Sequence, residues 1–347
     1  MTSSGLAERL FRHLEAFDPH GAAHLVRDAI ANGVSVQSVI VDGLVPAQRW
    51  VGELWQRGVW SVAQEHAATA IVDDLLGLLG GRTPRGRHGT VALVSAEGEW
   101  HVTPARMAAA LWRAAGWEVT FLGGSTPPDH LRATLGLIRL DLVAVSCSVP
   151  LSLPGASRVV EALRELEVPM LGGGQGFGPD RHRADALGLH GWAASATEAP
   201  ALFHRWMDRA PDHRERLHTD DEELTLELQR PERVTAAERR LLQRFPAMRS
   251  YDERQRLRTR EDLDYILQFA GVSLMVDDER IFHDFLAWLL EVLEGHGVPI
   301  EALIGGLDAL LGVITDLPRT IALLEAGYGR LDGPVNETRE TDAGTRS

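Results

Sequence analysis

The chain has 347 residues, of which 44% are hydrophobic, and its formal net charge is −14 at pH 7. This length allows two or three domains, and the negative charge argues against nucleic acid as a partner, because phosphate binding favours patches of basic residues. We find no apolar run long enough to span a bilayer and no signal peptide, so we expect a cytoplasmic protein without a membrane contact. The single cysteine, Cys147, excludes an internal disulfide and a zinc site with several cysteines.

Residues 1–82 have the pattern of a small helical bundle. Leu6, Leu10, Leu14 and Phe17 recur at helical spacing, and similar apolar stripes follow over 22–30, 36–45 and 61–79. Four short helices of this kind predict a four-helix bundle at the start of the chain.

Residues 88–210 alternate between apolar runs and helical stretches. The runs at 90–95, 117–122, 141–147, 168–172 and 190–194 predict strands, and 104–115, 128–138 and 155–166 predict helices between them. This alternation predicts a flavodoxin-like (Rossmann-like) parallel sheet, in which ligands bind beyond the carboxyl ends of the strands.

Polar and small residues gather in the loops after these strands. The first loop contains an acidic residue two positions before a histidine, the third contains serines and the fourth is rich in glycine. The candidate binding residues in these loops are Glu99, Trp100, His101, Val102, Ser146, Ser148, Ser152, Gly172, Gly173, Gly174 and Gln175.

His101 is the candidate metal ligand. An imidazole nitrogen suits cobalt, and a ligating His usually gives its other N–H to a carboxylate, which Glu99 or a more distant acid could supply. Taken alone, a surface-loop His is the simpler interpretation. The neighbouring loops favour a site, because small Ser and Gly positions let a long nucleotide tail pass beside the sheet.

On these residues, positions 1–210 resemble the cobalamin-binding module shared by methionine synthase, corrinoid methyltransferase proteins and light-sensing repressors. The family pattern is an acidic residue, x, His, x, x, Gly, followed by a Ser-containing loop and a Gly-Gly loop. The resemblance implies that His101 is the lower ligand of cobalt. The chain departs from the pattern at Pro104, which stands where the family has Gly, and this proline could open the next helix.

Trp55, nine further residues and then Glu65-His66 resemble the cap of the adenosylcobalamin photoreceptors, where these residues surround the adenosyl group. The alternatives are a core tryptophan and a pair on a helix surface. In the light-sensing repressors the Trp is followed by a His that can take cobalt after photolysis, whereas this chain has Gln56. A second histidine ligand would then have to come from elsewhere, with His66 nearest, or water would take that position.

The rest of the chain is charged over 211–232, which predicts a linker with a short strand near 224–228, and helical over 233–331. The polar residues 333–347 predict a disordered tail. The helical region could be a dimerisation or partner module, or a globin-like pocket for a bilin, with solvated helix faces an equally good interpretation. The candidate bilin-binding residues are Arg260, Asp264, Tyr265 and His283.

The order of these regions resembles the photocobilins, photoreceptors that use cobalamin and biliverdin. This resemblance implies a non-enzymatic, adenosylcobalamin-dependent light sensor with non-covalent biliverdin as second chromophore. Light would change its domain packing, its homo-oligomeric state or its contact with an unknown effector protein. The alternatives are a corrinoid methyl carrier of a methyltransferase system and a protein that senses cobalamin without light.

Overall fold

The computed structural model describes residues 4–80, 88–212, 216, 221–295 and 297–344. The chain divides into two compact units, Met1–Leu217 and His218–Ser347, and each is considered separately. Among the described residues, none of the helices is both long and apolar enough to cross a membrane.

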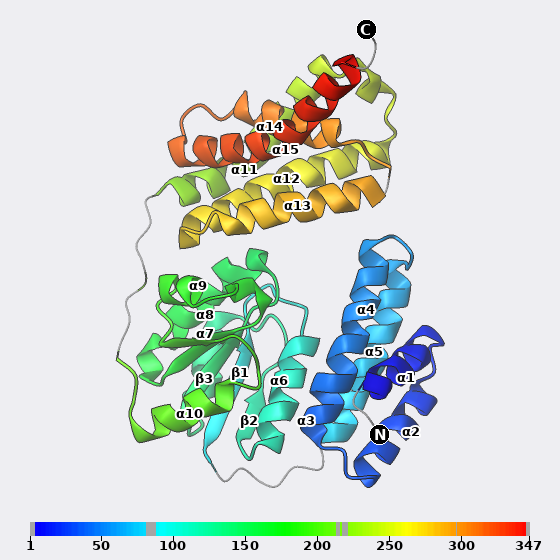
Figure 1. Cartoon of the computed structure of the whole chain (residues 1–347). Helices are drawn as coiled ribbons and strands as arrows, with labels where there is room; N and C mark the ends of the chain where they lie inside the picture. Colours follow the sequence, from blue (N-terminus) through cyan, green and yellow to red (C-terminus); the bar gives the residue numbers. More distant parts are fainter. Residues whose placement is uncertain (1–3, 81–87, 213–215, 217–220, 296, 345–347) are drawn as a thin grey trace. The chain divides into compact units, whose positions relative to one another are not determined.

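The first unit begins with a helical cap (Figure 1). Its elements are α1 (Ser4–Glu15), α2 (Pro19–Ala31), α3 (Val36–Ser38), the π-helical turn η1 (Val39–Leu44), α4 (Val45–Gln56) and α5 (Val62–Gly80). Leu6, Leu10 and Leu14 of the expected stripe are buried in the cap core, whereas Phe17 lies beyond the end of α1 and is 43% exposed. The third predicted helix is longer than expected, because η1 leads directly into α4, with Pro46 near the junction.

A five-stranded parallel sheet follows the cap, as predicted. The strands are β1 (Thr90–Ser95), β2 (Glu118–Phe121), β3 (Leu142–Ser146), β4 (Met170–Gly173) and β5 (Gly191–Ala193). Their order is β2-β1-β3-β4-β5, the flavodoxin-like order. The helices between and after them are α6 (Thr103–Ala114), α7 (Pro128–Leu135), α8 (Leu153–Leu163), α9 (His182–Ala186) and α10 (Ala199–Asp208).

Helices cover both faces of the sheet (Figure 1). The central strands are therefore buried on both sides, which explains the continuous apolar run Val91–Val94 in β1. On one face, α6 and α10 meet where the rings of Trp112 and Phe203 pack edge to face, with 5.0 Å between their centroids. Because all neighbouring strands pair in parallel, their carboxyl ends lie at one edge of the sheet.

The second unit is all helical, as predicted. It consists of α11 (Glu222–Arg244), the short helix η5 (Pro246–Ser250), α12 (Glu253–Val276), α13 (Arg280–Gly295), α14 (Ile300–Leu311) and α15 (Pro318–Gly344). The side chains of Asp252 and Gln255 form a reciprocal capping box at the start of α12. Stacked rings of Phe269 and Phe285, 3.8 Å between centroids, join α12 to α13.

Two expectations about this region were wrong. Residues 224–228 belong to α11 and not to a strand within a linker, since only Leu226 of the alternating leucines is buried while Leu224 and Leu228 are exposed. The expected disordered tail belongs to α15, which is helical as far as Gly344. Residues 345–347 lie outside the described part of the chain.

Candidate functional site

The loops that follow β1, β2, β3 and β4 meet at the carboxyl edge of the sheet, where a ligand site is expected (Figure 1). Hydrogen bonds join the loops to one another. The Gly98 N–H donates to Ser125 Oγ at 3.0 Å, and the Gly176 N–H donates to the Cys147 carbonyl at 2.9 Å. The loops therefore form one connected surface.

Glu99 and His101 form the polar centre of this surface. Glu99 is only 1% exposed, and its Oε1 lies 2.6 Å from His101 Nδ1. Because an ionised carboxylate only accepts hydrogen bonds, Nδ1 must carry the proton, which leaves Nε2 of the neutral ring with a free lone pair. The imidazole is 67% exposed, so the buried acid orients a ring that remains available to a ligand.

Backbone donors hold the Glu99 carboxylate in place. Oε2 accepts hydrogen bonds from the N–H groups of Ser148 at 2.9 Å and Val149 at 3.3 Å, and Oε1 also accepts from the His101 N–H at 2.8 Å. The Ser148 hydroxyl donates to the His101 carbonyl at 3.2 Å. The loop after β3 therefore holds the Glu99 carboxylate in place, and Glu99 in turn orients the ring of His101. The sequence pattern did not reveal this role for Ser148.

The pKa values of this pair move apart. Burial raises the pKa of Glu99, but the hydrogen bonds from His101 and Ser148 outweigh burial, and the net pKa is lowered. The hydrogen bond that His101 donates to Glu99 is the main cause that raises the pKa of His101, against burial, and the charge of Glu65 in the cap raises it further. Glu65 and His101 are thus close enough to interact electrostatically.

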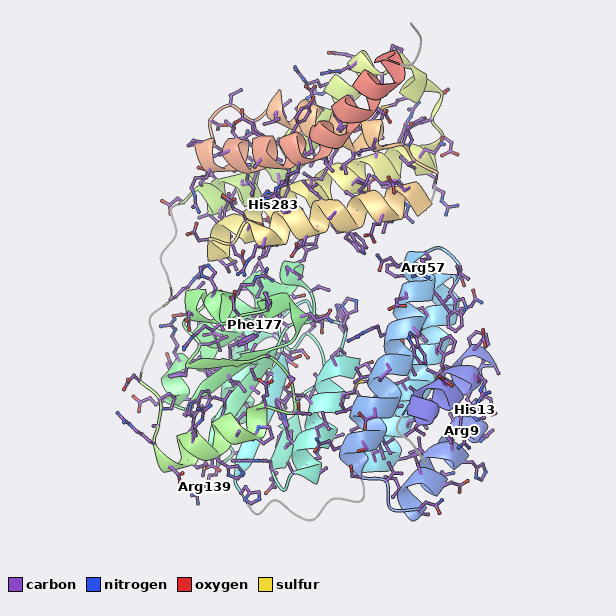
Figure 2. All side chains as sticks on the ribbon, in the orientation of Figure 1. Arg9, His13, Arg57, Arg139, Phe177 and His283 are labelled. Carbon is purple, nitrogen blue, oxygen red and sulfur yellow. The ribbon has the colours of Figure 1, made fainter. Side chains whose placement is uncertain are left out.

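Glycines shape the loop after β4. Gly174 has φ +102°, and a Cβ there would lie 2.4 Å from the Cys147 carbonyl oxygen, so only glycine fits. A Cβ at Gly172 would meet Leu189 and Phe177 within 3.1 Å, whereas at Gly173 it would meet nothing closer than 3.9 Å. The ring of Phe177, labelled in Figure 2, therefore packs against the backbone at Gly172.

Ser95, the last residue of β1, was missed by the sequence analysis. It is 2% exposed and pairs in register with Ser146 of β3, and its hydroxyl has no hydrogen-bond partner among the described residues. A buried hydroxyl without a partner is costly, so it marks a place where a ligand can supply the partner. The signal in the sequence was the single polar residue that ends the apolar run Val91–Val94.

Other predicted loop residues take supporting positions. Trp100 is 75% exposed, and Val102 is the N-cap residue of α6, in which Pro104 lies in the first turn. Val102 also occupies the space that a side chain at Gly124 would need. The remaining predicted residues Ser146, Ser152 and Gln175 lie at the end of β3 and in the short helices after β3 and β4.

The predicted cap residues lie on both sides of the turn between α4 and α5. Trp55 is 40% exposed, while Trp60 is buried and stacks on Phe11, so the core tryptophan of this turn is Trp60. Glu65 and His66 open α5 and bond to each other, with Glu65 Oε2 2.6 Å from His66 Nδ1. Arg57, at the end of α4, marks this turn in Figure 2.

The cap is anchored beside the predicted metal ligand. Thr103 Oγ1, two residues after His101, donates to Asp73 Oδ1 of α5 at 3.0 Å, and Arg106 forms an ion pair with the same carboxylate at 3.0 Å. These contacts hold α5 against the start of α6.

The candidate bilin residues of the second unit have separate partners. Arg260 pairs with Glu238, and Asp264 pairs with Arg230, each at 2.8 Å or less. Tyr265 is 46% exposed. His283, labelled in Figure 2, has a buried Nε2 with no hydrogen-bond partner among the described residues.

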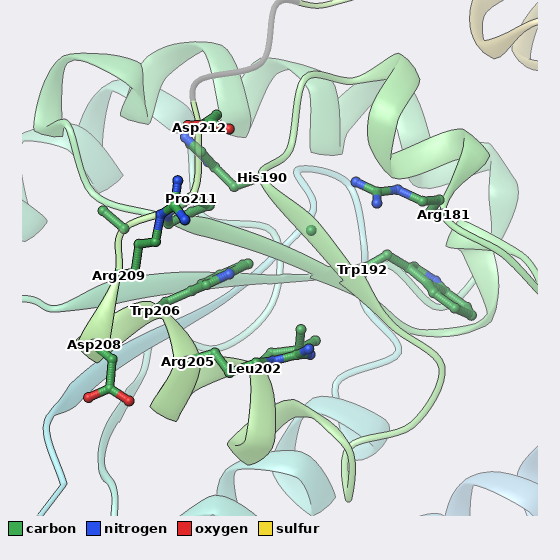
Figure 3. Close-up of a pocket in the computed structure, with 12 residues that line it drawn as sticks. Arg181, His190, Trp192, Leu202, Arg205, Trp206, Asp208, Arg209, Pro211 and Asp212 are labelled. Carbon is green, nitrogen blue, oxygen red and sulfur yellow. The ribbon is translucent and has the colours of Figure 1, made fainter.

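A separate cavity of about 690 Å³ lies where β5 begins (Figure 3). It is lined by Trp192 and Trp206 and by three arginines, Arg181, Arg205 and Arg209. Because His190, which precedes β5, also lines it, this cavity is at the opposite end of the strand from the Glu99 loop.

Comparisons with known proteins identify both halves of the first unit. Residues 6–79 and residues 89–201 each match the model of a B12 (cobalamin) binding domain. The chain is 26% identical over 172 residues to dimethylamine corrinoid protein 1 of Methanosarcina acetivorans, a match that covers 47% of this chain and 79% of that protein. It is 23% identical over 195 residues to a corrinoid protein of Desulfitobacterium hafniense, covering 53% and 88%.

The fold agrees with these matches. The structure resembles the monomethylamine corrinoid protein of Methanosarcina barkeri with a TM-score of 0.52 and 18% identity, covering 59% of this chain and 99% of that one. The second unit lies outside both matched ranges. The chain therefore contains two cobalamin-binding domains, a helical one over residues 6–79 and an α/β one over residues 89–201.

Proposed function

We propose that the chain carries cobalamin with its own nucleotide base displaced and with His101 Nε2 as the lower ligand of cobalt. The observation that supports this most strongly is the 2.6 Å hydrogen bond between buried Glu99 and the exposed ring of His101. It reserves Nε2 for a metal, as a carboxylate partner does for histidine ligands in general.

The surrounding residues fit the rest of the cofactor. The unpartnered Ser95 hydroxyl and the open space at Gly173 lie at the sheet edge where a displaced nucleotide tail would pass. Bound cobalamin supplies a cobalt–carbon bond, which can pass a methyl group to a partner or break when it absorbs visible light. The protein's part is to orient His101 through Glu99 and to hold the cap beside it through Asp73.

Within this proposal, we infer that the chain is a corrinoid protein of a methyltransferase system, which carries a methyl group between partner proteins. The named relatives are corrinoid proteins, two of them of methylamine systems, and they support this function over the others. The exposed rings of His101 and His66 and the partly exposed Trp55 are consistent with access by a partner.

The first experiment is to load the purified full chain with methylcobalamin and record its absorption spectrum. We expect the wild-type chain to retain the cofactor with the spectrum of a histidine-ligated, base-off form. His101→Ala should lose that spectrum and most of the affinity, while His130→Ala, an exposed histidine of α7, should keep both. An unchanged spectrum in His101→Ala would refute the ligand assignment.

A second candidate, the adenosylcobalamin light sensor, is favoured by one observation, the exposed Trp55 at the end of α4, across the turn from Glu65-His66 at the start of α5. If the chain is a light sensor, biliverdin would bind in the second unit, near His283 Nε2, which has no hydrogen-bond partner among the described residues. Size-exclusion chromatography before and after green light separates the two candidates. A change of oligomeric state in the illuminated adenosylcobalamin-loaded chain supports the sensor, and an unchanged oligomeric state after the spectrum shows that photolysis has occurred supports the carrier.

A further inference from the structure

The cavity at the start of β5 is lined by side chains that the proposed function does not use. Its volume of about 690 Å³ is within the range of small-molecule sites. The C-terminal end of α10, with Arg205, Trp206 and Arg209, meets the beginning of β5 here. The cavity therefore belongs to the edge of the sheet opposite Glu99 and His101.

Two tryptophan rings form the aromatic part of the lining. Trp206 packs on β5, because a Cβ at Gly191 would lie 2.7 Å from Trp206 Cζ2. The bare backbone of the strand thus fixes one edge of this indole ring, while the side chain stays partly exposed. Trp192, the next residue of β5, also lines the cavity and is partly exposed (Figure 3). Indole rings in this setting suit a flat aromatic ligand, which can stack on them.

Three guanidinium groups accompany these rings, in a chain whose net charge is −14. Arg205 and Arg209 are four residues apart and so lie on one face of the end of α10, and neither has an ion pair among the described residues. Arg181, at the start of α9, forms a two-pronged pair with Asp185 at 2.8 and 3.0 Å. Two of the three guanidinium groups thus lack a carboxylate partner in the described part of the chain.

The carboxylates of the lining leave this positive charge in place. Asp208 points away from the two indole rings, and Asp212 lies next to His190 (Figure 3). The C-terminal end of a helix attracts cations by itself, which would account for Arg205 and Arg209 alone. That role would require neither the cavity nor the two partly exposed rings, so the combination favours a ligand that is both flat and anionic.

We propose that this cavity binds a nucleoside phosphate, with the base stacked on Trp206 and the phosphate held by Arg205 and Arg209. A planar guanidinium presents paired N–H donors that match phosphate oxygens, and an indole face accepts any base. Binding is non-covalent, so no bond of the nucleotide forms or breaks. The cavity shares no residue with the Glu99 and His101 site, so this inference does not depend on cobalamin.

The test uses the full-length chain loaded with methylcobalamin, so that the cobalamin site is already occupied, and adenosine monophosphate as the probe. Isothermal titration calorimetry measures its affinity, and adenosine and inorganic phosphate are titrated separately. We expect saturable binding of adenosine monophosphate, with adenosine and phosphate each about 10-fold weaker or more, because each lacks half of the contacts. The absorption spectrum of cobalamin should stay unchanged. If the chain does not retain methylcobalamin, the same titration of the chain alone tests the cavity.

Three variants complete the test. Arg205→Gln combined with Arg209→Gln removes two exposed charges, and we expect the affinity for adenosine monophosphate to fall about 10–100-fold. Trp206→Leu should lower it about 5–100-fold through lost stacking, and thermal unfolding checks that this variant is folded. Arg139→Gln, an exposed arginine in the segment before β3, is the control and should bind as wild type.

Three outcomes would overturn the inference. The first is no saturable binding of adenosine monophosphate at millimolar concentration, and the second is equal affinity in the wild type and in the combined arginine variant. The third is a change in the cobalamin spectrum during the titration, which would place the nucleotide at the cobalamin site instead.

Discussion

A side chain at Gly155 would collide with the backbone of Glu97, since a Cβ there would lie 1.9 Å from the Glu97 carbonyl oxygen. Gly155 lies in the first turn of α8, and Glu97 lies on the loop that leads to Glu99 and His101. The start of α8 therefore sets the position of the loop that carries the predicted cobalt ligand.

Gly155→Ala should displace this loop. We expect a loss of about 1–3 kcal/mol in the free energy of unfolding, the usual cost of overpacking, together with weaker cobalamin binding. Thermal unfolding and a hydroxocobalamin titration measure the two effects. Gly52→Ala in α4 is the matched control, because no atom lies within 4 Å of its added Cβ and alanine favours a helix by about 0.5–1 kcal/mol. Equal stability in both variants would contradict the packing argument.

Glu99→Gln tests the carboxylate without changing its shape. The amide cannot accept hydrogen bonds on both sides, so either His101 Nδ1 or the Ser148 N–H loses its partner. We expect cobalamin affinity to fall about 10–100-fold, as for other partners of metal-binding histidines. Equilibrium titration measures this, with Glu97→Gln as control, since Glu97 lies on the same loop but pairs with Arg158. Comparable losses in both variants would count against a specific role for Glu99.

Cobalamin affinity should fall in acid. A proton on His101 Nε2 competes with cobalt for the same lone pair, and the hydrogen bond that His101 donates to Glu99 raises the pKa of His101 above its ordinary value of 6.5. The loss of affinity therefore begins at a higher pH than for an isolated histidine, as the pH falls through the raised pKa. Titrations across this range should show a lower midpoint in Glu99→Gln, and an identical midpoint would contradict this coupling.

Most of the first unit could be predicted because burial on both faces of a parallel sheet leaves a strong pattern. The apolar runs are continuous over Val91–Val94 and in the stretch that ends at Ser146. The strands, and the loop that carries Glu99 and His101, could therefore be predicted from the sequence. The pairing of Glu99 with the backbone of Ser148 could not be predicted, since it joins residues 49 positions apart. Ser95 was missed because an unpartnered hydroxyl is visible only in three dimensions.

The structure of the second unit was harder to predict, again because the decisive contacts join residues that are far apart in the sequence. Leucines at alternating positions near Leu226 suggested a strand, but the helix is stabilised by packing of its buried face in the helical core, which a local pattern does not reveal. Arg260 and Asp264 looked free to bind a ligand, yet they pair with Glu238 and Arg230 of a neighbouring helix. Which charged residues are available depends on tertiary contacts, so only the helices themselves could be predicted.

Asp262 of α12 should make the stability of the second unit depend on pH. Burial is the main cause that raises its pKa from 3.8 to about 6, and Glu261 adds to the effect. Because the folded unit binds this proton more tightly than the unfolded chain, its free energy of unfolding is larger below the ordinary pKa and is lost as the pH rises through about 6. Asp262→Asn removes the buried charge, so we expect a gain of about 1–2 kcal/mol at neutral pH. Hydrogen exchange in α12 of the full chain, at neutral and at acid pH, measures it. The variant should lose the pH dependence that the wild type and the exposed control Glu253→Gln retain, and a destabilised Asp262→Asn would show that the carboxylate has a stabilising partner instead.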